Sequence, residues 1–331
     1  MRTTAVVWTA IVTLGLGLVA PSFASAHPPA KPALTGLRVL ITNDDSVQPE
    51  RGTGLFELRK ALCGAGADVL VVGPWGPQSG MGGRITTSGP VTVQAVAPPA
   101  AYQNDCSDAP TGGKVFGACA GAGPCDATSA SASPADTSQL AITRFIPDNF
   151  WAEGPAVVLS GINPGHNSGE ALIHSGTVNA AVTAHDLDVP AIAFSEEVIT
   201  SCITSGVDCP QFTGAATFAV ELLTALSNAR QLKPDLLLNV NYPNIRTGEK
   251  LAGPVLSVQG SYALLPGFTG AVGAAGGTYT VGVVDPSPET LRNGEQVALD
   301  ANKISVAPLS GSWSFAPQIS PQLRRVIRSL S

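Results

Sequence analysis

The sequence is short of charge, and of positive charge in particular. Charged residues make up 13% of its 331 residues, and 18 lysines and arginines stand against 24 aspartates and glutamates, a net charge of −6. A protein that binds the backbone of a nucleic acid needs a basic face, so this composition argues against a nucleic-acid polymer as partner. A phosphate group would have to be bound locally, by backbone amides or a metal ion.

Several motifs that define enzyme classes are also missing. The sequence has no Gly-x-Ser-x-Gly element, which a serine esterase would need. The Gly-rich segment 73–84 lacks the lysine and the spacing of a P-loop, and it is not a dinucleotide fingerprint. A nucleoside hydrolase of the calcium type would need more aspartates near Asp45, and residues 46–54 contain none. These absences leave other hydrolase chemistry open.

One apolar run is long enough to be a targeting segment, and it lies at the start. Arg2 precedes an apolar run over 5–20, and Ala24-Ser25-Ala26 has the small-residue pattern of a cleavage site. The run is shorter than the roughly 20 residues that span a bilayer, and no later stretch is long and apolar enough. We therefore expect a signal peptide over 1–26, cleaved after Ala26, and a secreted or periplasmic protein with no membrane segment. An uncleaved signal anchor is the alternative.

The six cysteines fit an exported protein. An even number of cysteines in such a chain suggests disulfides, although six allow 15 pairings. Cys202 and Cys209 flank a short polar loop and form the first pair that we predict. Zinc binding is the rival interpretation, but no Cys-x-x-Cys pair exists and the four histidines lie elsewhere. The cysteines are Cys63, Cys106, Cys119, Cys125, Cys202 and Cys209.

From Leu37 the chain alternates between short apolar runs and helical stretches. Such alternation, with strands rich in branched residues, predicts an α/β fold of Rossmann-like type, in which helices cover both faces of a mostly parallel sheet. The expected strands are 37–42, 68–72, 91–94, 156–160, 191–195 and 236–241, and the expected helices are 53–65, 134–144, 175–185 and 213–227.

Composition divides the chain into regions. Residues 98–133 are rich in Ala, Gly, Ser and Pro, carry three cysteines and show no clear period, which indicates a surface insertion. It interrupts a core that we place at 27–253. Residues 254–331 turn Gly-rich, with β-like pieces near 278–284 and 304–307, and predict a C-terminal extension of β-hairpin type that packs on the core or on a second subunit.

Three polar clusters follow predicted strands, where ligands collect in open α/β sheets. The first is Asn43-Asp44-Asp45-Ser46, whose adjacent carboxylates suit a hard divalent cation, although an Asx-turn or a helix cap is the plainer interpretation. The second is the Gly-rich loop 73–84, which includes Ser79 and Gly80. The third runs from Ser160 to Thr177 and ends in a helix start of the kind that binds phosphate.

These clusters resemble the SurE survival-protein family. The resemblance covers about 37–243, interrupted by the insertion, and a weaker resemblance is present at 305–308. It is carried by six ordered segments: Asn43-Asp44-Asp45, the Ser79 loop, Ser133-Pro134-Ala135-Asp136, Ser160-Gly161-Ile162-Asn163, His174-Ser175-Gly176-Thr177 and Leu238-Asn239-Val240-Asn241-Tyr242-Pro243.

The resemblance implies a metal-dependent phosphatase of the 5′/3′-nucleotidase and acid phosphatase type, acting on nucleoside monophosphates or similar small phosphate esters. It also implies Mg²⁺ or Mn²⁺ and a homo-oligomer, a dimer or tetramer, whose C-terminal segments reach between subunits. The residues it assigns are metal ligands Asp44, Asp45, Ser79 and Asn163; phosphate and substrate contacts Asn43, Gly80, Asn167, Ser175, Gly176 and Thr177; and catalytic groups Asp44, Asp45, Ser175 and Thr177.

Some residues depart from the family pattern. Ser46 stands where the family usually has Gly, which would strain the backbone if that position needs a positive φ. Gln78 replaces a frequent Arg, and Arg84 replaces a small residue. His166 and His174 are candidates for protonating the leaving oxygen, or they merely pack or cap. A secreted nucleotide- or phosphate-binding protein that has lost turnover is the alternative function.

Overall fold

The computed structural model describes residues 31–48, 53–246, 248–262, 266–270, 276–283 and 286–311. The predicted signal peptide lies outside these residues. From Pro32 onward the chain belongs to one unit. Among its described residues, no helix combines the length and the hydropathy that a membrane span requires.

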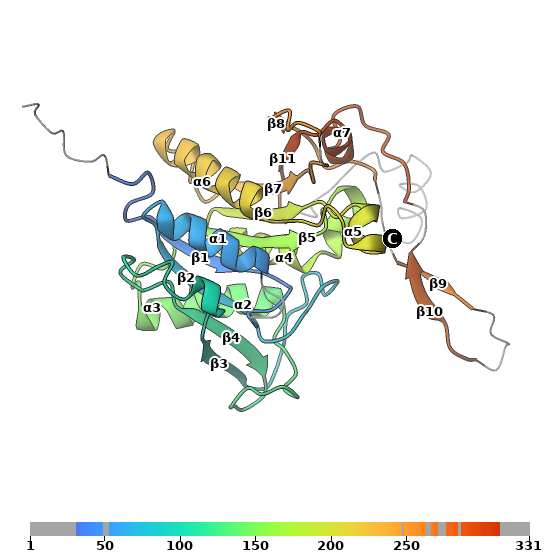
Figure 1. Cartoon of the computed structure of the whole chain (residues 1–331). Helices are drawn as coiled ribbons and strands as arrows, with labels where there is room; N and C mark the ends of the chain where they lie inside the picture. Colours follow the sequence, from blue (N-terminus) through green and yellow to red (C-terminus); the bar gives the residue numbers. More distant parts are fainter. Residues whose placement is uncertain are drawn as a thin grey trace, which may run out of the picture. The chain divides into compact units, whose positions relative to one another are not determined.

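A nine-stranded sheet forms the centre of this unit, with the strand order β3-β4-β2-β1-β5-β6-β7-β11-β8 (Figure 1). The six strands from β4 to β7 run parallel, whereas β3 and β11 are antiparallel to their neighbours β4 and β7. The predicted α/β fold with a mostly parallel sheet is confirmed. The strands are β1 (Arg38–Thr42), β2 (Asp68–Pro74), β3 (Val91–Val96), β4 (Val115–Ala120), β5 (Val157–Pro164), β6 (Ala191–Glu196), β7 (Leu237–Tyr242), β8 (Pro254–Leu256) and β11 (Ile304–Pro308).

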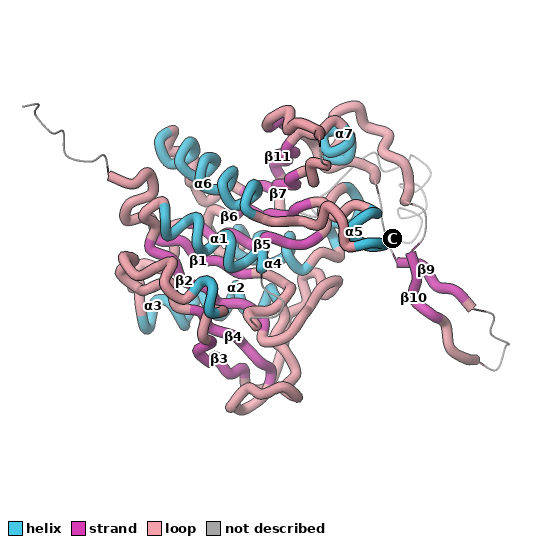
Figure 2. The backbone as a smooth tube through the Cα atoms, in the orientation of Figure 1, coloured by secondary structure: helices cyan, strands magenta, loops and turns pink. Residues whose placement is uncertain are grey.

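Helices cover both faces of the sheet. Helices α1 and α6 pack together on one face, and α2 and α4 pack together on the other (Figure 2). Short helical turns lie at Ala100–Tyr102, Ala141–Phe145 and Gly169–Ile173. The helices are α1 (Thr53–Gly64), α2 (Pro134–Leu140), α3 (Ile146–Asn149), α4 (Gly176–His185), α5 (Thr200–Ser205), α6 (Thr213–Asn228) and α7 (Glu295–Asp300).

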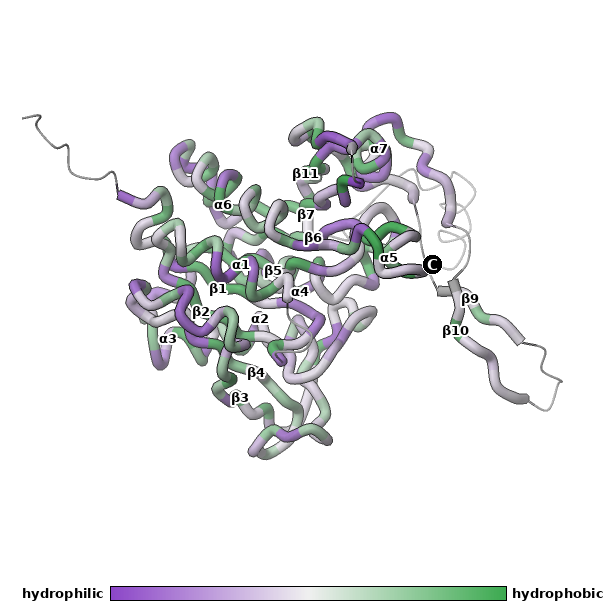
Figure 3. Tube along the Cα trace, viewed as in Figure 1, coloured by the Kyte–Doolittle hydropathy of each residue, from purple (hydrophilic) through white to green (hydrophobic). Residues whose placement is uncertain are grey.

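The strands are buried on both faces, as their continuous apolar runs predict. In β1, Val39 and Ile41 pack into the core under α1 and α6, while Leu40 between them packs into the core under α2 and α4. Side chains alternate between the faces of a strand, so an unbroken apolar run serves two cores at once. Figure 3 shows the apolar colouring that results along the strands of the sheet.

The two helices nearest the predicted site begin with side-chain caps. Ser133 accepts a hydrogen bond from the Asp136 N–H, and Asp136 accepts one from the Ser133 N–H, so α2 starts with a capping box. Ser175 caps α4 by accepting a hydrogen bond from the Val178 N–H. The predicted helix over 134–144 is longer in the structure, because α2 continues through the π turn into α3.

The predicted surface insertion 98–133 needs a correction. Its residues Val115–Ala120 form β4, which lies between β2 and β3 inside the main sheet. The strand was missed because its middle residues are small. Gly117 shows why: a Cβ there would come within 2.7 Å of the Trp75 ring. The packing therefore selects against the branched side chains that make a strand recognisable.

The predicted C-terminal extension is also more than a hairpin. Strands β8 and β11 extend the main sheet beyond β7, and α7 packs on β11. A separate hairpin is present as well, formed by β9 (Pro266–Thr269) and β10 (Thr280–Val283). Strands β8 and β11 thus complete the main sheet, while residues 312–331 lie outside the described part.

Three disulfides join all six cysteines. The predicted Cys202–Cys209 bond is confirmed, and the others are Cys63–Cys106 and Cys119–Cys125. Next to Cys63–Cys106, the buried Arg59 on α1 donates hydrogen bonds to the carbonyls of Tyr102 and Gly113. The segment before β4 is therefore fixed to α1 by one covalent bond and one buried cation.

Candidate functional site

The predicted site residues lie at the carboxyl edge of the parallel sheet. Asn43-Asp44-Asp45 directly follows β1, and Asn163 lies near the end of the neighbouring strand β5. Pairing of Thr42 with Ser160 fixes the register between these two strands. The sheet itself therefore places these groups on one edge, where open α/β folds bind ligands.

Asp44 joins the end of β1 to the start of α4. The Thr177 hydroxyl donates a hydrogen bond of 2.6 Å to Asp44 Oδ1, and both residues are buried. Gly176 leaves room for this contact, because a Cβ there would lie 2.7 Å from the Asp44 Cβ. The structure thus brings Asp44, Gly176 and Thr177 together, with the cap Ser175 beside them.

Asp45 lies beside Asp44 and lacks such support. Burial, followed by repulsion from the Asp44 charge, raises the pKa of Asp45 to about 8. Burial also raises the pKa of Asp44, although the Thr177 hydroxyl and nearby backbone N–H groups oppose the rise. A bound cation would favour the ionised form of both carboxylates and would offset the repulsion between them.

The turn after these aspartates does place Ser46 at a positive φ. Its φ is 106°, a conformation that favours glycine. The Ser46 hydroxyl donates to the Trp75 carbonyl at 2.7 Å and accepts from the Gln48 N–H at 3.0 Å. These two bonds offset part of the strain, so the side chain of Ser46 stabilises the turn.

The Gly-rich loop after β2 is attached to both sides of this cluster. The Gln78 N–H donates to the Asp44 carbonyl at 2.7 Å, and the Gly82 N–H donates to the His174 carbonyl at 3.1 Å. Ser79 and Gly80 lie between these attachments and are exposed. The Gln78 bond therefore holds the loop against the backbone of Asp44, and Ser79 and Gly80 follow directly after it in the chain.

Asn163 and Asn167 follow on from β5, the strand next to β1, and their side chains bond to groups other than the aspartates. Asn163 donates to the Gly165 carbonyl at 2.6 Å, and the Asn167 side chain donates to the Ser195 hydroxyl at 2.9 Å. Among the described residues, no hydrogen bond joins either asparagine to Asp44 or Asp45. The predicted site thus has an aspartate side around α4 and a loop side around Asn167.

Sequence reasoning missed the residues that hold the loop side. Asn239 and Asn241 at the end of β7 bind the Asn167 backbone, and Glu295 at the start of α7 accepts a hydrogen bond from the Gly169 N–H. All three side chains are fully buried. The pattern Asn239-Val240-Asn241, two amides on one face of a strand, was the available signal, whereas nothing local singles out Glu295.

The two histidines differ in their surroundings. The His166 ring packs against the Tyr262 ring, 5.6 Å between centroids, and its Nε2 is buried. Burial lowers the pKa of His166. His174 is exposed next to Ser175, and Arg84 is exposed too. Of these residues, His174 is the one placed beside the helix start.

The donor set fits a hard divalent cation. Asp44 and Asp45 supply carboxylate oxygens, and Ser79 and Asn163 supply neutral oxygens. The buried Asn43 Oδ1 has no hydrogen-bond partner among the residues that the structure describes. Mg²⁺ and Mn²⁺ prefer oxygen ligands of this kind. Within the described ranges, no cluster of three or more His, Cys, Asp or Glu forms a metal site, so the neutral oxygens are needed.

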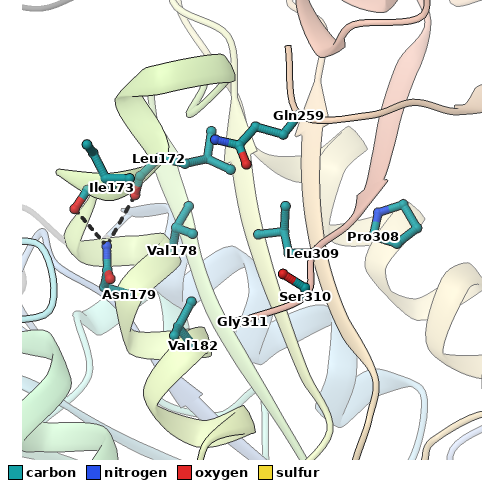
Figure 4. A pocket seen from close by; sticks show the side chains of 10 residues that line it. All are labelled: Leu172, Ile173, Val178, Asn179, Val182, Gln259, Pro308, Leu309, Ser310 and Gly311. Carbon is teal, nitrogen blue, oxygen red and sulfur yellow. Dashed lines mark hydrogen bonds between the residues drawn. The ribbon is translucent and has the colours of Figure 1, made fainter. Parts of the chain in front are cut away.

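A separate cavity of about 360 Å³ lies on the α4 face, away from the aspartates. Figure 4 shows it between α4 and the segment after β11, with Asn179 hydrogen-bonded to the backbone of Leu172 and Ile173. None of the predicted site residues lines it. Its lining residues are mostly apolar, so it does not have the chemistry of the strand-edge site.

Fold and site together define an α/β protein with an oxygen-rich acidic site at the carboxyl edge of its sheet. Residues 39–262 match the family model described as "Survival protein SurE". The chain therefore belongs to the SurE family.

Individual relatives agree with this assignment. The chain is 34% identical over 213 residues to a protein of Alkaliphilus metalliredigens named 5′-nucleotidase SurE, covering 64% of this chain and 68% of that protein. It is 31% identical over 294 residues to the 5′-nucleotidase SurE of a Nostoc species, covering 86% and 96%. The solved structure of the SurE protein of Aquifex aeolicus has the same fold, with a TM-score of 0.61, 24% identity and coverage of 88% and 98%.

Proposed function

We propose that this protein is a metal-dependent phosphomonoesterase that hydrolyses nucleoside 5′- or 3′-monophosphates or similar small phosphate esters. The observation that carries the proposal is the Asp44–Asp45 pair at the end of β1, hydrogen-bonded through Thr177 to the start of α4. The relatives named 5′-nucleotidase support the same reaction class.

The aspartate side contains the groups that phosphate transfer needs. Asp44, Asp45, Ser79 and Asn163 would hold Mg²⁺ or Mn²⁺, which supplies charge neutralisation and an activated water when bound. The N-terminus of α4, with Ser175, Gly176 and Thr177, would bind the phosphoryl oxygens through its free N–H groups and its dipole. Thr177 keeps Asp44 in place at this helix start, so both functions share one fixed geometry.

Charge balance explains why a cation is required. A phosphate monoester is an anion, and it would approach the buried carboxylate of Asp44 and the half-buried carboxylate of Asp45. Among the described residues, no ion pair involves Asp44 or Asp45. The helix dipole alone contributes about 0.3–1 kcal/mol for a surface charge, which is too little to offset such repulsion. A divalent cation between the carboxylates and the phosphate removes that obstacle.

The first test is phosphate release by the purified protein. The panel is nucleoside monophosphates and an aryl phosphate, with Mg²⁺ or Mn²⁺ and then with EDTA. We expect release that EDTA stops and added metal restores. Binding of nucleotide without release, in protein shown to be folded, would instead support the phosphate-binding alternative.

We also propose that the protein works outside the cytoplasm. The predicted signal peptide and the three disulfides support this, because disulfides persist in oxidising compartments. Fractionation of expressing cells, with N-terminal sequencing of the exported protein, tests cleavage after Ala26. Full-length protein retained in the cytoplasm would contradict the proposal.

Finally, we propose a homo-oligomer, a dimer or tetramer. The hairpin of β9 and β10 exposes Phe268 and Val281, which are 72% and 63% accessible. Within the described residues, these two strands pair only with each other. Light scattering should give a mass two or four times that of one chain, and a monomer at micromolar concentration would contradict this expectation.

A further inference from the structure

The segment Asn167–Gly169 connects the two ends of the proposed site, and side chains from much later in the chain hold it. Asn241 accepts a hydrogen bond from the Asn167 N–H at 2.8 Å and donates one to the Asn167 carbonyl at 2.8 Å. Asn239 donates to the same carbonyl at 2.7 Å. We call this segment the linking loop, because Asn163 precedes it and Ser175 follows it.

Glu295 is the charged member of this group. Its Oε2 accepts a hydrogen bond of 2.8 Å from the Gly169 N–H, and its Oε1 accepts one of 2.6 Å from the Asn239 amide. The Asn241 amide lies at 3.5 Å from the same Oε1. The carboxylate thus contacts the linking loop directly and also fixes the strand residues that bind the loop.

These contacts require that both terminal atoms of side chain 295 accept hydrogen bonds, as the two carboxylate oxygens of Glu295 do. Every hydrogen bond made by the Glu295 side chain comes from an N–H donor, and an ionised carboxylate offers acceptors only. Above the raised pKa of Glu295, about 7, the carboxylate is ionised, and such charge-assisted bonds are then stronger than bonds between neutral groups. A neutral amide of the same size would turn an NH₂ group toward either Gly169 or Asn239, where a donor already lies.

The linking loop is also held from its other side. The Gln259 amide donates to the Gly169 carbonyl at 3.0 Å. Gly169 has a φ of 58°, and a Cβ there would collide with the Tyr262 backbone. The loop is therefore held from two sides, with the Gly169 N–H directed at Glu295 and the Asn167 N–H directed at Asn241.

We propose that Glu295 is a positioning residue of the phosphatase site, whose carboxylate holds the linking loop and so sets the spacing between Asn163 and the start of α4. The proposal rests on the proposed function, since the spacing matters only if both ends act on one substrate. Phosphate transfer depends on such positioning, because small displacements of the reacting groups cost large factors in rate.

The test compares Glu295→Gln with Glu170→Gln. The control makes the same chemical change one residue beyond Gly169, at an exposed side chain. Both proteins are measured well below their unfolding temperatures. For Glu295→Gln we expect kcat with aryl phosphate to fall about tenfold or more, with a much smaller change in KM, as for an interaction that matters in the transition state. The control should keep the wild-type values.

Hydrogen exchange in EDTA, without substrate, provides the second measurement. The amides of Asn167 and Gly169 should exchange about tenfold faster in Glu295→Gln and at the wild-type rate in Glu170→Gln. Faster exchange with an unchanged kcat would overturn the proposal, and so would a lower kcat with unchanged exchange. A purely structural role predicts lower thermal stability with the kcat of the folded protein intact.

The experiment also distinguishes failure of the proposed function from failure of the Glu295→Gln variant to fold. If wild-type protein releases no phosphate with any metal, the proposed function fails, and the positioning role fails with it, while exchange still reports whether Glu295 holds the loop. If Glu295→Gln does not fold, Glu295→Asp replaces it, because it keeps the charge but withdraws the oxygens by one methylene. Wild-type kcat and exchange in that variant would overturn the proposal.

Discussion

The two sides of the site each contain buried acids with raised pKa values, but for different reasons. On the aspartate side, Asp45 has its pKa raised to about 8 by burial and by the Asp44 charge. On the loop side, burial raises the pKa of Glu196 and of Glu295 to about 7, although N–H donors oppose the rise. A raised pKa alone therefore does not identify a catalytic acid. Unrelieved repulsion between neighbouring carboxylates is the more specific sign.

The largest effect should come from breaking the aspartate side. Asp45→Asn should lower phosphate release by at least about 100-fold, because it removes a charge that the metal needs. In EDTA its unfolding temperature should be equal to or above that of the wild type, since the repulsion with Asp44 is gone. Steady-state assays and calorimetry check both results.

Asp235→Asn is the matched control for that variant. Asp235 is exposed and precedes the N-terminal end of β7, whereas the proposed site lies at the C-terminal ends of the parallel strands. Wild-type activity is expected for it. Equal activity of Asp45→Asn and the wild type would remove Asp45 from the site.

A smaller loss should follow from breaking the loop side. Asn241→Ala leaves the half-buried backbone of Asn167 with fewer partners, which costs about 1–2 kcal/mol of unfolding free energy. We expect activity to fall about tenfold, less than in Asp45→Asn, because the charges remain. Asn228→Ala, at the exposed end of α6, is the control, and denaturant unfolding with assays of the folded protein gives the measurement. A loss as large as that of Asp45→Asn would place Asn241 among the reacting groups.

The pH dependence of stability should show that Glu196 acts structurally. Its carboxylate accepts a hydrogen bond from the Gln211 N–H, and burial raises its pKa from 4.5 to about 7. Because the folded protein favours the protonated form, the stabilisation is complete below about pH 4.5 and is lost as the pH rises to about 7. In Glu196→Gln that loss, on the order of 2 kcal/mol, should be missing. Denaturant unfolding at pH 5 and pH 7.5 in EDTA measures it, and identical pH dependence in both proteins would contradict the assignment.

The smallest effect concerns the turn after the aspartates. Ser46→Ala keeps the strained φ of 106° and loses both hydroxyl hydrogen bonds, whereas Ser46→Gly loses the bonds and relieves the strain. The glycine variant should therefore be more stable than the alanine variant by about 1 kcal/mol. Paired denaturant titrations are precise enough to see this. The reverse order would mean that backbone strain at Ser46 is negligible.

The parallel core could be predicted from the sequence because a strand that is buried on both faces has an unbroken run of apolar residues. Unbroken runs such as Val69–Val72 are required where a strand contacts helices on both sides. The aspartate side could be predicted for a related reason, since its polar residues directly follow such runs. Strand β4 could not, because close packing on Trp75 demands small residues there.

Glu295 could not be predicted because its partners are distant in sequence. The Gly169 N–H is 126 residues away, and no local pattern distinguishes a buried glutamate at a helix start from an exposed one. The strands β8 and β11 were expected as an extension because Gly-rich sequence hides the pairing of β11 with β7 and of β8 with β11. Only the fold shows that Glu295 binds the linking loop near Gly169.

The position of Glu295 also has a consequence for the order in which the site is assembled. A ribosome delivers the chain from its N-terminus, so β1, the Gly-rich loop and α4 are all available once His185 has been made. The linking loop must wait for Asn239 and Asn241, and then for Glu295, which arrives more than 100 residues after α4. A nascent chain can therefore form its aspartate side early, yet its linking loop lacks part of its support until Glu295 has been made.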